Sequence, residues 1–69
     1  MKTLQIIELA KKNIDNGASM QSSAKLCLDD ALNLLKLGGC EDVVRIRAIK
    51  SLKYSVGIFH PDYQAAIEE

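Results

Sequence analysis

The sequence contains no tryptophan, one proline, four glycines and only three aromatic residues in a length of 69 residues. So few turn residues argue against a loop-rich or low-complexity protein. The scarcity of aromatic side chains means that the core must be built from Leu, Ile, Val and Ala. The length allows one domain, which we place over residues 1–69, and leaves no room for a second.

An excess of charge of one sign is also absent, because nine basic residues balance nine acidic residues. This balance, together with a hydrophobic fraction of 48%, is not the composition of an intrinsically disordered chain. A net charge of zero gives no general attraction to nucleic acid or to a membrane surface. The apolar runs are only a few residues long, so we expect no membrane-spanning helix.

Cysteine is scarce as well, since Cys27 and Cys40 are the only two. The N-terminal segment carries charges such as Lys2 and Glu8 among its apolar residues, which is unlike a secretory signal peptide. We therefore expect reduced thiols and a cytoplasmic location rather than a disulfide framework. A core this small rarely supplies more than about 3–5 kcal/mol alone. Oligomerisation or a binding partner is the extra stabiliser that we expect.

Apolar residues recur at helical spacing in three segments, which cover approximately residues 3–15, 20–37 and 41–59. Asn16-Gly17 and Gly38-Gly39 separate these segments, because glycine adopts the left-handed conformation that ends many helices. Pro61 ends the third segment. The sequence therefore predicts an all-α fold, a small three-helix bundle made of a helical hairpin plus an N-terminal helix. Residues 61–69 are predicted to form either a short fourth helix or a flexible tail.

The second helix has the widest apolar surface, so we predict that it is central and touches both neighbours. Thr3 and Ser19 are the predicted N-caps of the first and second helices. In the third helix, the small residues Ala48, Ser51 and Ser55 should let a neighbouring backbone approach closely. The residues expected to face the core are Leu4, Ile7 and Ile14, with Ile6 widening the same face, then Ala24, Leu28, Ala31 and Leu35, then Val44, Ala48, Ile49, Leu52, Ser55, Val56 and Phe59.

The third helix carries a basic set, Arg45, Arg47, Lys50 and Lys53, in a segment that has no acidic residue from position 43 to 60. One interpretation is an electrostatic footprint for nucleic acid or for an acidic protein surface. The other is an ordinary solvated face, whose charge is offset by acidic residues elsewhere in the chain. The zero net charge favours the second interpretation.

The same helix has apolar residues on the side away from its core face, namely Val43, Ile46, Tyr54 and Ile58. A helix that is apolar on more than one face usually has more than one neighbour. That neighbour is either a partner molecule or the C-terminal tail folded back after Pro61. The sequence leaves both possibilities open.

Residues that carry chemistry are few. A zinc site needs three or four ligands, and the only candidates besides carboxylates are Cys27, Cys40 and His60, which lack the close-spaced pair of such sites. The adjacent carboxylates Asp29 and Asp30 point in different directions on a helix, which favours a solvated face over an acid–base pair. We therefore predict no catalytic residue, no cofactor and no metal.

These observations predict a small non-enzymatic protein-binding module that acts as a homo-oligomer, an adaptor or a chaperone-like subunit. The alternative is a nucleic-acid-binding protein that uses the basic residues of the third helix. No membrane contact and no small-molecule substrate are inferred. The residues predicted to contact the partner are Arg45, Ile46, Arg47, Lys50, Lys53, Tyr54 and Ile58.

Overall fold

The computed structural model describes residues 1–18 and 20–68, and in this part of the chain the regular secondary structure is all helical, without strands. The helices are α1 (Thr3–Asp15), α2 (Gln21–Lys36), α3 (Glu41–Val56) and α4 (Pro61–Ile67). The predicted all-α fold with three main helices is therefore confirmed. Of the two possibilities for the segment after His60, the structure has the short fourth helix.

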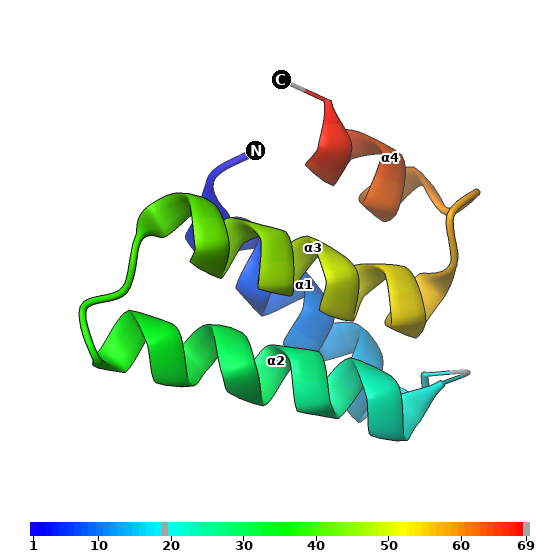
Figure 1. The fold of residues 1–69 in the computed structure, drawn as a ribbon. Helices are drawn as coiled ribbons and strands as arrows, with labels where there is room; N and C mark the ends of the chain where they lie inside the picture. Colours follow the sequence, from blue (N-terminus) through cyan, green and yellow to red (C-terminus); the bar gives the residue numbers. More distant parts are fainter. Residues whose placement is uncertain (19, 69) are drawn as a thin grey trace.

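The central helix is α3. It packs against α2 and α1 and also carries α4, whereas α1 and α2 have much less contact with each other. Figure 1 shows α2 and α3 as an antiparallel hairpin, with α1 behind them and α4 along α3. The backbone forms a flat body of 29 × 26 × 14 Å. The prediction that the second helix is central was wrong. The width of the apolar surface of a helix does not reveal which helix the other helices will pack against.

The core consists almost entirely of aliphatic side chains. Its buried members are Ile6, Ile7, Ala10, Ile14, Ala24, Leu28, Ala31, Val44, Ala48, Leu52 and Ala66. Three residues expected in the core are exposed, namely Leu4 in the first turn of α1, Leu35 in the last turn of α2, and Phe59. In α1 both Ile6 and Ala10 are fully buried, because the helix is turned so that Ile6, and not Leu4, faces its neighbours.

Two of the predicted helix ends also need correction. The N-cap of α1 is Lys2 rather than Thr3, and the Lys2 amide donates a hydrogen bond of 2.8 Å to Gln5 Oε1. The third helix stops at Val56, three residues early, because Gly57 has φ +90° and leaves the helical conformation. Phe59 is consequently not on the core face but 90% exposed. The predicted cap Ser19 lies outside the described residues, and Met20 occupies the N-cap position of α2.

The small residues of α3 have the predicted role. Ser51 is buried and its Oγ donates a hydrogen bond of 2.6 Å to the backbone carbonyl of Ala24 in α2. Ser55 is buried one turn later, and its Oγ donates to the carbonyl of Ser51. Both hydroxyls are therefore satisfied in the core. A side chain as short as serine reaches a neighbouring backbone only when the two helices are close.

The short helix α4 begins at Pro61, whose fixed φ and missing N–H suit the first helical position. His60 is its N-cap, and the ring Nδ1 accepts a hydrogen bond of 3.1 Å from the Asp62 amide. The Gln64 side chain donates to the carbonyl of Ile58, which ties α4 to the preceding loop. Ala66 is buried, so α4 is docked on the bundle.

Candidate protein-binding surface

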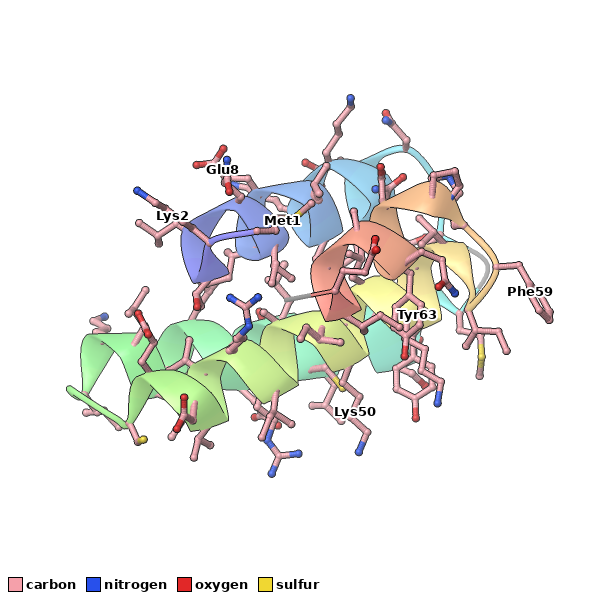
Figure 2. The ribbon with its side chains drawn as sticks, turned by 90° about the horizontal axis from the view of Figure 1, so that it is seen from above. Met1, Lys2, Glu8, Lys50, Phe59 and Tyr63 are labelled. Carbon is pink, nitrogen blue, oxygen red and sulfur yellow. The ribbon has the colours of Figure 1, made fainter. Side chains whose placement is uncertain are left out.

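A row of four residues runs along the free side of α3, and we call it the outer stripe of α3. Its members are Val43, Ile46, Lys50 and Lys53, spaced by three, four and three residues. At about 100° per residue these positions lie on the side of the helix opposite the buried Ala48. All four are exposed, Val43 by 40% and Ile46 by 60%. Figure 2 shows the Lys50 side chain pointing away from α1.

The outer stripe of α3 changes character along its length. Its N-terminal half is apolar through Val43 and Ile46, and its C-terminal half is basic through Lys50 and Lys53. The aliphatic part of each lysine extends the apolar strip, while the ammonium group remains in water. The stripe therefore combines a small apolar contact with positive charge at one end.

The structure brings some of the predicted site residues together and separates others. Ile46, Lys50 and Lys53 share the outer stripe, and Arg47 flanks it as a half-buried residue. Tyr54 is half-buried and packs against the core. The remaining two predicted residues lie elsewhere: Ile58 is exposed in the α3–α4 loop, and the half-buried Arg45 lines a groove near the start of α1.

The possibility that the C-terminal segment covers the apolar residues of α3 can be examined directly. Helix α4 packs against α3, yet it leaves Ile46 largely exposed. The described C-terminal segment therefore does not cover Ile46.

A second exposed row, which the sequence analysis missed, lies on α2. This outer stripe of α2 consists of Leu26, Asp30, Asn33 and the C-cap Leu37, spaced by four, three and four residues. It lies opposite the buried Ala24 and Ala31 by the same helical geometry. Leu26 is 65% exposed, and Leu37 is 84% exposed. The indication of this row in the sequence is that Leu26 and Leu37 do not belong to the repeat of core-facing residues in this helix.

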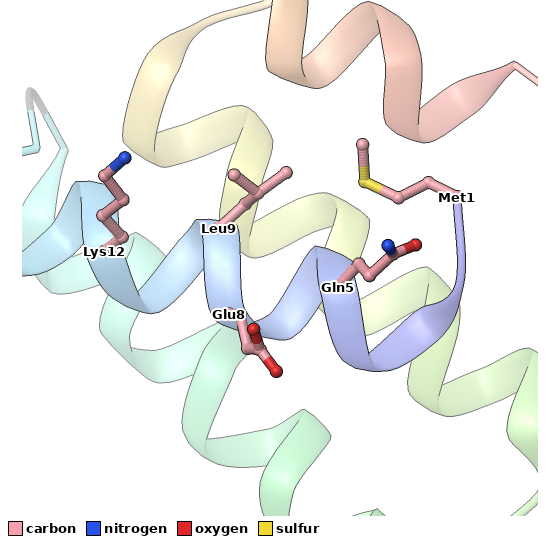
Figure 3. Close-up of a pocket in the computed structure, with 5 residues that line it drawn as sticks. All are labelled: Met1, Gln5, Glu8, Leu9 and Lys12. Atoms are coloured by element: carbon pink, nitrogen blue, oxygen red, sulfur yellow. The ribbon is translucent and has the colours of Figure 1, made fainter.

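Two open grooves border α1. The first has a volume of about 490 Å³ and is lined by Met1, Gln5, Glu8, Leu9 and Lys12. Figure 3 shows Met1 and Leu9 pointing toward the side where α4 lies, whereas Glu8 points the other way. The second groove, of about 570 Å³, is lined by Met1, Lys2, Thr3, Leu4, Glu41, Asp42 and Arg45. The carboxylates that line the two grooves, Glu8, Glu41 and Asp42, are exposed.

The residues with metal-binding or nucleophilic chemistry are scattered. Over residues 1–18 and 20–68, no three His, Cys, Asp or Glu side chains are placed to hold one metal ion. His60 is engaged in capping α4, with the Asp62 carboxylate 3.9 Å from the same Nδ1. Cys27 is half-buried and Cys40 is exposed at the start of α3, and neither forms a disulfide.

None of the four helices in the described part of the chain has both the length and the apolar character needed to span a bilayer. Comparison with models of protein families, with curated proteins and with solved structures finds no match to this chain. The case for a function therefore depends on the surface chemistry of the helices themselves.

Proposed function

We propose that this chain is a small, non-enzymatic, cytoplasmic protein-binding module whose contact surface is the outer stripe of α3. The observation that carries the proposal is the position of Ile46. It is a large aliphatic side chain on a well-formed helix, mostly exposed, next to exposed Val43 and in line with two lysines. Continuous apolar surface bordered by charge is typical of interaction sites.

Binding would proceed by burial of the apolar half of the stripe against a helix or groove of the partner. Lys50 and Lys53 would meet carboxylates of the partner and thereby fix its orientation, because charges at the edge of an interface contribute specificity and association rate more than affinity. Arg47 lies at the same edge. The partner predicted by this chemistry is a protein surface that carries both apolar and acidic side chains.

The nucleic-acid alternative uses the same lysines together with Arg47. Two features count against it: half of the outer stripe is aliphatic, and Glu41 and Asp42 open the helix with negative charge. Phosphate binding would show itself by a steep loss of affinity with added salt. Fluorescence anisotropy with labelled DNA and RNA oligonucleotides at two salt concentrations is the direct test, and we expect no salt-sensitive binding.

The proposal is tested by site-specific photocrosslinking in cells that express the full chain. A photoreactive phenylalanine analogue replaces Ile46 in one variant, and in the matched control it replaces Leu4, which is also 60% exposed but lies on α1. We expect protein adducts from position 46 that exceed those from position 4 and decrease when Lys50→Asp is added. Equal adducts from both positions would overturn the proposal. Adducts that nuclease removes would favour the alternative.

A further inference from the structure

The two outer stripes of this chain are chemically complementary. The stripe on α3 joins aliphatic residues to lysines, whereas the stripe on α2 joins two exposed leucines to Asp30 and Asn33. Within one molecule the two stripes cannot meet, because the inner faces of α2 and α3 are already packed together through Ser51 and Ala24. A second copy of the chain can bring them together.

We propose that the outer stripe of α3 binds the outer stripe of α2 from another copy of the same chain. The inference rests on the proposed function and names its partner. The charged side chains of the two stripes have opposite signs, with Lys50 and Lys53 on α3 and Asp30 on α2. Opposite charges on the two surfaces favour this pairing over contact between two identical stripes.

The spacing of the residues fits an antiparallel arrangement. In that direction Val43 lies opposite Leu37 of the other copy, and Lys50 lies opposite Asp30. Lys53 then extends its aliphatic part along Leu26, and Ile46 fits between Leu37 and Asn33 as a knob between neighbouring side chains. In this arrangement Val43 and Ile46 both contact Leu37, and the carboxylate of Asp30 meets the ammonium group of Lys50.

A parallel arrangement also pairs the two stripes. Ile46, Lys50 and Lys53 are spaced by four and three residues, and so are Leu26, Asp30 and Asn33. Ile46 then lies opposite Leu26, and Lys50 again lies opposite Asp30. The charge pair is therefore the same in both directions, and the test below is aimed at that pair.

This contact is heterologous, because one copy contributes the outer stripe of α3 and the other copy contributes the outer stripe of α2. A pair of copies still has one unbound outer stripe of α3 and one unbound outer stripe of α2. Further copies therefore add, either until a ring closes or without limit as an open filament. We therefore expect a distribution of oligomers that shifts to larger sizes with protein concentration, rather than a single dimer.

The test is sedimentation velocity on the purified full-length chain across a wide range of concentration at low and high salt. We expect the mass-average size to rise with concentration, and the rise to be smaller at high salt because the charges are partly exposed. Lys50→Asp and Asp30→Lys should each weaken the association about tenfold, which corresponds to about 1.4 kcal/mol. Asp29→Lys is the matched control, since this neighbouring exposed carboxylate lies 100° away on the helix and should leave association unchanged.

The decisive step is to mix the two charge-reversed variants. Lys50→Asp and Asp30→Lys should each associate more weakly alone than the unsubstituted chain, because like charges then face each other. Their mixture should associate again, because every contact between unlike copies pairs opposite charges, and the double variant should do so by itself. Circular dichroism of each variant must match the unsubstituted chain, so that a loss of association is not a loss of fold.

A chain that stays monomeric at all concentrations would overturn the inference, as would a mixture that fails to associate. The proposed function is judged separately. If the purified chain is monomeric but position 46 still crosslinks to a protein in cells, the surface binds a different partner and only the self-association is wrong. If the crosslinking also fails, the surface is not an interaction site.

Discussion

Ser51 Oγ lies 2.6 Å from the carbonyl oxygen of Ala24 and donates a hydrogen bond to it, which joins the central helix directly to α2. The serine is fully buried, and the carbonyl belongs to a buried alanine. This pair makes the contact between the two helices sensitive to the size and polarity of one side chain.

Replacing this serine should destabilise the fold in two distinguishable ways. Ser51→Ala removes the hydrogen bond and should lower the free energy of unfolding by about 1 kcal/mol. Ser51→Val adds volume at a tight contact and should lower it by about 1–3 kcal/mol. Urea denaturation followed by circular dichroism measures both. Ser22→Ala, at an exposed position of α2, is the control and should have little effect.

Gly57 sets the end of α3 through its backbone conformation. Its φ of +90° and ψ of +164° are essentially restricted to glycine. A Cβ at this position would meet no atom within 4 Å, so the cost of Gly57→Ala arises from the backbone alone. We expect Gly57→Ala to lower the free energy of unfolding by about 1–3 kcal/mol. A chemically synthesised chain with D-alanine at this position should recover most of that loss, and equal effects of both enantiomers would contradict the explanation.

His60 holds the first turn of α4 through one hydrogen bond to the Asp62 amide. His60→Ala removes the acceptor and should weaken α4 by about 1 kcal/mol, the usual value of an N-cap side chain. His60→Asn keeps an acceptor at the cap and should retain most of the stability. Amide hydrogen exchange resolves the effect, because protection should fall for the α4 amides of Gln64 and Glu68 but not for those in the middle of α3.

Ile46 and Leu52 belong to the same helix but should respond very differently to truncation. Leu52 is fully buried, and Leu52→Ala should cost about 2–5 kcal/mol of unfolding free energy. Ile46 is mostly exposed, and Ile46→Ser should change the stability of the monomer by no more than about 0.5 kcal/mol. Chemical denaturation at low protein concentration makes the comparison. A large loss for Ile46→Ser would show that this residue is part of the core.

Local signals predicted the individual helices well. The first helix has the predicted bounds, because helical periodicity and Asn16-Gly17 both act over a few residues. The predicted third helix is three residues too long, because Gly57, and not Pro61, ends it. The positive φ of Gly57 is a feature of the folded backbone that an isolated glycine in a periodic segment does not reveal.

The arrangement of the helices was harder to predict than the helices themselves. Which helix becomes central depends on how three apolar surfaces fit together, and α3 is central through small residues rather than through a wide apolar surface. Ile46, Lys50 and Lys53, which belong to the predicted partner-binding residues, share one exposed side of α3. Leu26 and Leu37 were missed, because the other leucines of α2 obscured a second stripe.

The central position of α3 also has a consequence for the order of folding. The main partner of α1 is α3, so its contacts span the whole of α2, whereas the α2–α3 hairpin forms between neighbours in the chain. Contacts between segments that are distant in the sequence require the closure of longer loops. The entropic cost of closing these loops slows the formation of such contacts. We therefore expect the hairpin to assemble first and to serve as the template on which α1 docks.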